Sequence, residues 1–370
     1  MTKHNADNER IKRKYFAFLK EAKRLSVQSV DGVASALSRY EGYTKYKDFR
    51  TFNTDQVSAF KNHLMEQKGL RSGEKLSKAT LHATFNQLKH FFQWLSREPG
   101  YIARIKYNDA EFFNLSRNDT HIATAKREQR WPTLEQIKHT LDMMPANTEI
   151  ECRNRALFAF TILTGARDSA IASMKMKHVN LEQGCVYQDA RDVKTKFRKT
   201  FTTDFFPVGD EIRKIVEDWV TFLRTEKHWG VDDPLFPKTQ LAIRASQQFE
   251  AAGLMREHWS TATPIRTIFK EAFGKAELPY SNPHSFRNTL VQLCYSKCKT
   301  HEQTKAWSQN LGHDSVLTTL TSYGEVSRQR QAEILQGMAN PQQAVQTGAD
   351  EIAEAVFRKL CNSGMDMQAR

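Results

Sequence analysis

Apolar residues in the first third of the chain recur at intervals of three and four, the spacing of one buried helix face. The clearest stripe starts after Ser77, a helix-capping residue type, and stops at Pro99-Gly100. Similar patterns at residues 11–25 and from Thr54 onward predict further helices. The regular period favours burial of the aromatic rings over a base-stacking surface, so we expect a helical domain. The positions of the clearest stripe are Leu81, Phe85, Leu88, Phe91, Phe92 and Leu95.

This helical pattern ends in a polar segment. Residues 116–130 are polar and basic without an apolar period, which predicts a linker. Thr133 and Gln136 then have the spacing of a capping box, and Leu134, Ile137 and Leu141 form the stripe of a new helix.

Strand-like patterns appear only in the middle of the chain. Short runs of β-forming residues at 185–187 and from 200 through 208 lie on either side of a basic turn, 194–199. Helical patterns return at 209–226 and 263–276 and dominate from residue 284. The expected fold class is therefore mainly α with a small antiparallel β-sheet.

The charge of the chain is unevenly distributed. The net charge is +13, and residues 1–130 contain 25 Lys and Arg against 14 Asp and Glu. A basic segment of this kind favours a polyanion as partner, because Lys and Arg displace the counterions condensed on phosphates. A solvated basic face without such a partner explains the charge alone equally well.

Composition also argues against several classes of protein. No apolar run approaches the ~18–20 residues of a membrane span, and Met1-Thr2-Lys3-His4-Asn5 is not the start of a secretory signal. The five Cys are scattered, without the paired spacing of a zinc site. We therefore expect a cytoplasmic protein with reduced thiols, no membrane partner, no metal and no cofactor.

Three short motifs combine residues suited to phosphodiester chemistry. Arg167 follows a long apolar run and Thr164-Gly165-Ala166, and His284 and Arg287 are three residues apart. His313 follows Leu311-Gly312, and Tyr323 follows it by ten residues. A Tyr oxygen can form a covalent ester with phosphorus, and two Arg forks match the non-bridging oxygens of the transition state. Each residue alone is a common accident, but their order and chemistry agree.

The combined pattern resembles the tyrosine recombinases, the phage integrase family, over roughly residues 25–340. The resemblance implies a helical core-binding (SAM-like) domain followed by an α+β catalytic domain. It also implies a site-specific recombinase of a phage or other mobile element, acting on double-stranded DNA as a homotetramer through a 3′-phosphotyrosyl intermediate. The catalytic residues that it implies are Arg167, Lys194, His284, Arg287, His313 and the nucleophile Tyr323, with Lys196 as the less favoured lysine and Tyr295 as the alternative nucleophile.

The predicted organisation follows from this resemblance. The expected segments are a DNA-binding domain at 1–115, a basic linker at 116–130, a catalytic domain at 131–340 and a tail with one short helix at 341–370. Ala170 replaces the acidic residue usual three positions after the first Arg, and the His313–Tyr323 interval is one residue longer than usual. Two alternatives stay open: a DNA-binding protein of this fold that has lost catalysis, and a type IB topoisomerase.

Overall fold

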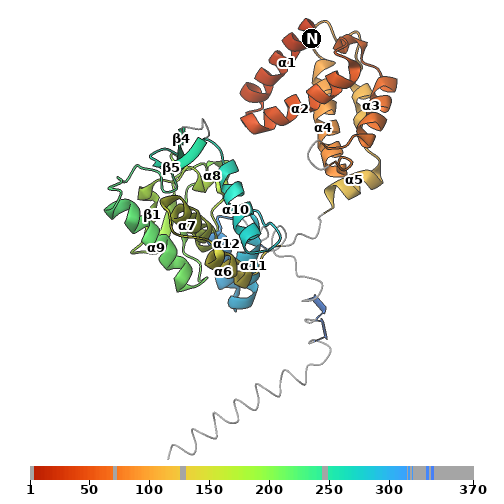
Figure 1. The fold of residues 1–370 in the computed structure, drawn as a ribbon. Helices are drawn as coiled ribbons and strands as arrows, with labels where there is room; N and C mark the ends of the chain where they lie inside the picture. Colours follow the sequence, from red (N-terminus) through yellow and green to blue (C-terminus); the bar gives the residue numbers. More distant parts are fainter. Residues whose placement is uncertain are drawn as a thin grey trace, which may run out of the picture. The chain divides into compact units, whose positions relative to one another are not determined.

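The computed structural model divides the chain into two compact units, residues 1–128 and 129–370, each with its own hydrophobic core (Figure 1). The structure describes residues 4–69, 73–125, 131–243 and 249–314, and six single positions beyond them: 316, 319, 331, 332, 335 and 336. The predicted tail helix at 350–360 lies outside the described residues.

The first unit is entirely helical apart from an isolated β-bridge between Lys68 and Lys75, within its described residues. All six residues of the clearest predicted stripe are at most 1% exposed, which confirms that this stripe is core. The helices are α1 (Ala6–Ala17), α2 (Val27–Thr44), α3 (Thr54–Glu66), α4 (Lys78–Leu95) and α5 (Arg117–Thr124), with a π-helical turn at Phe18–Ala22 and 3-10 helices at Phe49–Thr51 and Tyr107–Phe113.

Helix α5 corrects the linker that was predicted at 116–130. The Ser116 hydroxyl accepts a hydrogen bond from the backbone N–H of Asp119, 3.0 Å away, and caps the helix. The Asp119 carboxylate forms an ion pair with Lys78 of α4 at 2.8 Å. No residue of α5 is buried, so the helix leaves no apolar period in the sequence. Residues 126–130 of the expected linker lie outside the described part of the chain.

The second unit is built around helix α7 (Glu149–Thr164), which has α6, α9 and α11 as neighbours (Figure 1). Ten residues of α7 are buried, and they include the whole apolar run that precedes Arg167. A helix that is apolar on every side must be covered on every side, so α7 is central. The other helices are α6 (Leu134–Met143), α8 (Asp168–Ile171), α9 (Asp210–Thr225), α10 (Thr263–Lys275), α11 (Ser285–Lys297) and α12 (His301–Asn310), with a 3-10 turn at Met176–His178. The Thr133–Gln136 capping box before α6 is confirmed.

A small antiparallel sheet has the order β1–β2–β3, with β1 at Val179–Asn180, β2 at Cys185–Gln188 and β3 at Phe201–Asp204. The predicted run at 185–187 falls on β2, and the first half of the run from 200 through 208 falls on β3. The end of that run, 206–208, forms no strand, and its residues Phe206 and Val208 pack into the hydrophobic core.

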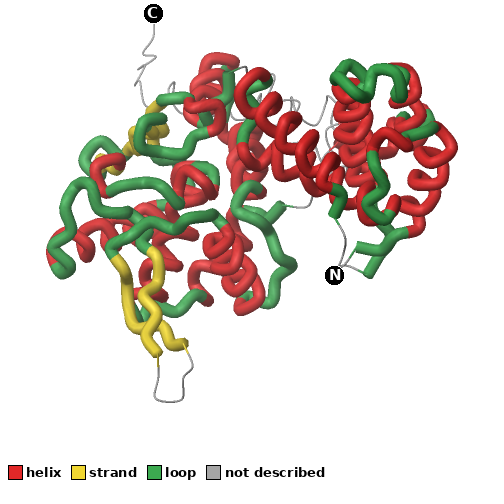
Figure 2. The backbone as a smooth tube through the Cα atoms, turned by 90° about the horizontal axis from the view of Figure 1, so that it is seen from above, coloured by secondary structure: helices red, strands yellow, loops and turns green. Residues whose placement is uncertain are grey.

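A second sheet, which no sequence pattern predicted, is the hairpin of β4 (Lys238–Ile243) and β5 (Phe249–Met255). Figure 2 shows it extending from the rest of its unit. Together these elements confirm the expected fold class, mainly helical with small antiparallel sheets. Within the described residues, no helix is long and apolar enough to span a bilayer.

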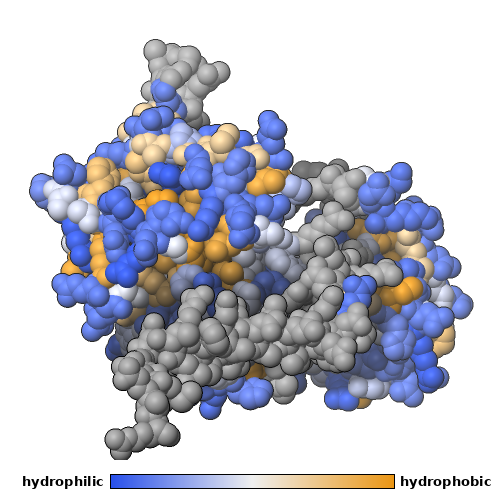
Figure 3. Space-filling view, turned by 90° about the horizontal axis from the view of Figure 1, so that it is seen from below, coloured by the Kyte–Doolittle hydropathy of each residue, from blue (hydrophilic) through white to orange (hydrophobic). Residues whose placement is uncertain are grey.

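Apolar side chains also reach the surface of the second unit (Figure 3). A pocket of about 470 Å³ there is lined by Ile215, Trp219 and Phe222 of α9 and by Cys152 of α7. Of the predicted catalytic residues, the five that the structure describes do not line this pocket; they are Arg167, Lys194, His284, Arg287 and His313.

Gly165 ends α7 in a left-handed conformation, with φ of 61°. Its N–H donates to the Thr161 carbonyl, 2.9 Å away. A Cβ atom at this position would lie 2.9 Å from Leu290 and 3.0 Å from Leu311. Both the backbone conformation and the surrounding core therefore require glycine where the chain turns toward Arg167.

We expect Gly165→Ala to lower the free energy of unfolding by about 1–3 kcal/mol, through left-handed strain and overpacking. Gly274→Ala is the matched control: Gly274 lies in α10, and a Cβ there meets no atom within 4 Å. The control should raise the free energy of unfolding by roughly 0.5–1 kcal/mol. Urea denaturation of both full-length variants measures the difference, and a change of the same sign in both would refute this account of Gly165.

Candidate active site

The guanidinium of Arg287 joins the three predicted motifs. Arg287 lies in α11 and is 3% exposed. Its Nη1 donates to the carbonyl of Gly165 at 2.6 Å, and its Nη2 donates to the carbonyl of Leu311 at 2.6 Å. Nη2 also lies 2.8 Å from Nε2 of His313. One buried side chain therefore holds the end of α7 and the turn after α12 against α11.

His313 is neutral in this arrangement. Because its Nε2 faces a donor, we assign the ring proton to Nδ1, which lies 2.8 Å from the hydroxyl of Thr319. Thr319 in turn donates to the hydroxyl of Ser308 in α12 at 2.8 Å. Burial, followed by the charges of Arg287 and Arg167, lowers the pKa of His313 to about 3. A proton on Nε2 would point directly at the guanidinium.

Gly312 lets this turn approach the small sheet. It has φ of 71°, and a Cβ atom there would lie 2.6 Å from the ring of Phe201 in β3. Asn310 completes the contact by donating from its side-chain amide to the Asp204 carbonyl at 2.9 Å and accepting from the Asp204 N–H at 2.7 Å. The Leu311-Gly312-His313 motif is thus a tight connection between α12 and β3.

Arg167 differs from Arg287 in how its donors are used. It lies immediately before α8 and is partly exposed. Within the described residues, its guanidinium has no hydrogen bond or ion pair, whereas the adjacent Asp168 carboxylate is bound by Arg266 at 2.8 Å. Its charge helps to lower the pKa of both His284 and His313. Arg167 therefore brings a cationic fork to the site with its donors available for an anion.

His284 stands one residue before α11, at the capping position. Its side chain keeps contact with solvent, but surrounding protein atoms partly desolvate the ring. This desolvation, followed by the charges of Arg287 and Arg167, lowers the pKa of His284 to about 4. Both site histidines are therefore neutral at pH 7 and act as hydrogen-bonding groups rather than as cations.

Two serines hold the main chain of Lys194. The Lys194 N–H donates to the hydroxyl of Ser173 at 2.8 Å, and its carbonyl accepts from the hydroxyl of Ser169 at 3.2 Å. Ser169 lies two residues after Arg167, and Ser173 lies one helical turn further. The loop between β2 and β3 is thereby fixed to the segment that carries Arg167, while the Lys194 side chain is exposed.

A network of ion pairs stabilises the start of the loop between β2 and β3. The Asp192 carboxylate lies 3.0 Å from Lys175 Nζ and 2.8 Å from Lys177 Nζ, and both lysines also pair with Asp232. Hydrogen bonds from the two lysines hold the pKa of Asp192 well below its usual range. Beneath them Val193 is 1% exposed. The base of the loop is therefore rigidly placed.

The other cations of this loop also face the site. Lys196 is close enough to contribute to the lowered pKa of His284, and Lys199 forms an ion pair with Asp314 at 2.6 Å, next to His313. The charge of Lys194 contributes, after burial, to the lowered pKa of His258.

Sequence patterns gave no role to His258, Thr319, Ser169 or Ser173. A lone His, Ser or Thr has no distinctive spacing, and only the fold brings these residues to the site.

Tyr323 lies outside the described residues, so its place relative to these groups stays a prediction. Tyr295, the alternative nucleophile, lies in α11 and is 41% exposed, and partial burial raises the pKa of its hydroxyl. The described residues contain no group of His, Cys, Asp and Glu side chains arranged to hold a metal ion.

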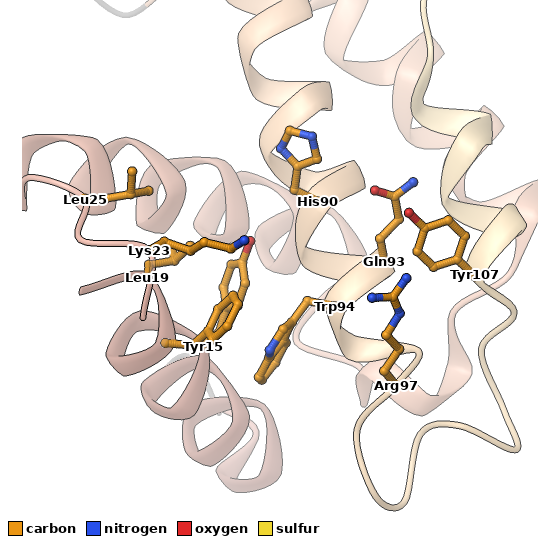
Figure 4. A pocket seen from close by; sticks show the side chains of 10 residues that line it. Tyr15, Leu19, Lys23, Leu25, His90, Gln93, Trp94, Arg97 and Tyr107 are labelled. Carbon is orange, nitrogen blue, oxygen red and sulfur yellow. The ribbon is translucent and has the colours of Figure 1, made fainter. Parts of the chain in front are cut away.

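The first unit contains a different kind of surface. A pocket of about 470 Å³ between α1, its π-helical extension and α4 has aromatic walls that include Tyr15, Trp94 and Tyr107 (Figure 4). Lys23 and Arg97 lie at the same pocket, with the Arg97 guanidinium 4.9 Å from the Tyr107 ring centre. This pocket has no counterpart of the Arg–His network, so the candidate catalytic groups are confined to the second unit among the described residues.

Comparison with known proteins agrees with this geometry. Residues 130–330 match the family model of the phage integrase family, and residues 13–99 match the phage integrase N-terminal SAM-like domain. The chain belongs to the phage integrase family. Membership makes this integrase-family protein a tyrosine-type site-specific recombinase, as the sequence motifs predicted.

Alignments with similar proteins cover most of this chain and nearly the whole length of each relative. Tyrosine recombinase XerD of Oceanobacillus iheyensis is 22% identical over 327 residues, covering 87% of this chain and 95% of the relative. Tyrosine recombinase XerC of Halalkalibacterium halodurans is 21% identical over 333 residues, covering 86% and 94%.

Solved structures show the same fold. Lambda integrase (75–356), solved as a dimer bound to a COC′ core site, has a TM-score of 0.59 at 14% identity, covering 85% of this chain and 95% of that one. The Tn1549 transposon integrase in complex with transposon right end DNA has a TM-score of 0.51 at 12% identity, covering 89% and 99%.

The neutral state of His313 predicts how stability depends on pH. Its pKa is about 3 in the folded protein and about 6.5 in an unfolded chain, so the unfolded state binds more protons between these values. Stability should therefore fall as pH drops from about 6.5, by up to roughly 1.4 kcal/mol per pH unit from this residue. Arg287, Arg167, His284 and Lys199 are the charged or titratable groups that lower this pKa further.

His313→Gln keeps an acceptor for Arg287 but cannot titrate. Urea unfolding of the variant should show a slope of stability against pH that is smaller by about 1 kcal/mol per unit between pH 6 and 4. Equal slopes for wild type and variant would show that His313 is not held neutral by the fold.

Proposed function

We propose that this recombinase cuts and rejoins duplex DNA at specific sites through a 3′-phosphotyrosyl intermediate on Tyr323. The observation that carries the proposal is the Arg287 network, which brings Gly165, Leu311 and His313 together beside the uncommitted guanidinium of Arg167. The loop that carries Lys194 is fixed to the same segment as Arg167.

In the proposed chemistry, the phosphotyrosyl bond conserves the energy of the broken DNA phosphodiester bond. The Tyr323 hydroxyl loses its proton to solvent and its oxygen bonds to phosphorus, while the bond from phosphorus to the 5′ oxygen breaks. Lys194 supplies the proton that the leaving 5′ oxygen needs. Attack by a 5′ hydroxyl on the phosphotyrosine reverses these steps and releases the tyrosine, so neither water nor a nucleotide is consumed.

The two arginines have unequal roles in this proposal. Arg167 has its donors available for the non-bridging oxygens, which carry developing charge in the transition state. Arg287 places its positive charge nearby, while its Nη1 and Nη2 both bond to protein acceptors. We assign neutral hydrogen bonding to His284 and His313, since both pKa values are far below 7.

We also propose double-stranded DNA as the partner and a tetramer on two paired sites as the working assembly. The basic first third of the chain, with 25 Lys and Arg against 14 acidic residues, supports the DNA partner. A lambda integrase of the same fold, with a TM-score of 0.56 at 14% identity, was solved as a tetramer bound to a Holliday junction.

For the biological setting we propose a phage or other mobile element. The Tn1549 integrase, which shares the fold, comes from a transposon. The curated relatives are named XerC and XerD, so a resolving role on identical sites is the competing hypothesis. Recombination between an element end and a different target sequence supports integration, whereas activity confined to two copies of one site supports resolution.

Tyr323→Phe removes only the attacking oxygen. We expect normal binding of the recombination site in a gel-shift assay and no covalent protein–DNA complex on a nicked suicide substrate. Tyr295→Phe, the matched control, should form the complex as wild type does. If Tyr323→Phe still becomes attached to DNA and Tyr295→Phe does not, the nucleophile is Tyr295. Absence of the complex in wild type would favour a DNA-binding protein that has lost catalysis.

Lys194→Ala should reduce cleavage by about 10²-fold or more, because the leaving oxygen then lacks its proton donor. A 5′-bridging phosphorothiolate has a sulfur leaving group that needs no proton, so it should restore most of the lost rate. Ser173→Ala, which removes the acceptor for the Lys194 N–H, should show a smaller loss with the same rescue.

Lys196→Ala is the control for this substrate. It should gain no more from the sulfur leaving group than wild type gains. Rescue of Lys196→Ala without rescue of Lys194→Ala would assign the proton donor to Lys196.

A further inference from the structure

The tip of the β2–β3 loop presents an aromatic ring to solvent. Phe197 is 82% exposed, the largest exposure among the large apolar side chains of the described residues. Its ring has Lys196 Nζ 4.9 Å from its centre. Single exposed apolar residues are common on protein surfaces, so exposure alone does not indicate a function.

The backbone at this tip is unusual as well. Phe197 has φ of 58° and ψ of 20°, and Arg198 has φ of 54°. Two successive residues with side chains are therefore in the left-handed region, which disfavours a bulky residue. Strain of this kind persists only where the surrounding structure enforces it, and it concentrates at functional sites.

The surrounding structure does enforce this conformation. Beyond the tip, the hydroxyl of Thr200 accepts from the N–H of Ala190 at 3.0 Å, which closes the loop. The Arg198 N–H donates to the Thr195 carbonyl at 3.3 Å. Together with the serine contacts of Lys194, these bonds hold Phe197 outward on a fixed stem.

The tip also lies beside the proposed chemistry. Lys196, next to Phe197, contributes to the lowered pKa of His284, and Lys199 pairs with Asp314 beside His313. The segment from Lys194 to Lys199 contains four cations, two before Phe197 and two after it. A DNA backbone bound at Arg167 would therefore run past a basic loop whose single apolar group is exposed.

We propose that Phe197 is a wedge that enters the base stack next to the scissile phosphate. Apolar side chains inserted at a base step unstack it and bend the duplex, while flanking cations bind the phosphates on either side. One face of the ring is near Lys196, and a base can stack on the ring as bases do on aromatic residues in single-strand binding sites. This inference rests on the proposed function, since it requires DNA at the site.

The test uses the full-length chain with Tyr323→Phe, which prevents cleavage, and a duplex containing the cleavage site mapped by covalent trapping. A single 2-aminopurine replaces each base in turn near the cleaved phosphate, because its fluorescence rises when stacking is lost. We expect a rise of about three-fold or more at one or two adjacent positions. Phe197→Ala should lose most of this rise while its gel-shift affinity changes by less than about ten-fold, since the phosphate contacts remain.

Three further variants separate the ring from its surroundings. Phe197→Gly fits the left-handed backbone without strain. If both the Gly and the Ala variants lose the fluorescence rise, the rise depends on the aromatic ring and not on the backbone conformation. Phe197→Trp keeps an aromatic ring and should show the fluorescence rise. Tyr187→Ala removes another exposed aromatic, on β2, and should leave the rise intact.

The outcomes distinguish the two proposals. If the parent protein does not bind the duplex, the proposed function fails. If it binds and no position brightens, or if Phe197→Ala brightens the same positions as the parent does, the wedge is refuted while the recombinase proposal stands.

Discussion

The burial of one positive charge organises the catalytic unit. The Arg287 guanidinium is removed from water, and its hydrogen-bond partners include two backbone carbonyls and a neutral imidazole. A buried charge is costly unless such groups solvate it, so the ends of α7 and α12 must stay in place around it. The same requirement keeps His313 unprotonated. The buried guanidinium therefore constrains both the fold of this unit and the protonation state of its site.

Local patterns predicted the parts of the fold that rest on local physics. The α4 stripe, the Thr133–Gln136 capping box and strands β2 and β3 follow from periodicity, capping and β-propensity. Helix α5 was missed because it buries no residue and is held by a cap and an ion pair. The β4–β5 hairpin was missed because its exposed strands show no clear alternation of apolar and polar residues.

In the candidate site, too, local sequence patterns predicted some features and missed others. Motif order predicted Arg167, His284, Arg287 and His313 as site residues. The structure brings Arg287 and His313 into contact and the charge of Arg167 close to both histidines. Sequence reasoning treated the two arginines as an equal clamp, whereas the structure commits the Nη atoms of Arg287 to protein acceptors. Two of those acceptors are backbone carbonyls more than twenty residues away along the chain, and carbonyls carry no sequence signal.

The ion pair between Lys199 and Asp314 has a consequence for the thermodynamics of DNA association. Both side chains are accessible, and the pair links the β2–β3 loop to the turn that holds His313. When a DNA phosphate approaches, it competes with Asp314 for the same ammonium group. The lysine then exchanges one anion for another, so the free energy gained is smaller than a solvated lysine would provide. The carboxylate set free takes up a cation from solution, which offsets part of the counterion release from DNA. The affinity of this loop for DNA should consequently depend less steeply on salt concentration than its number of basic residues implies.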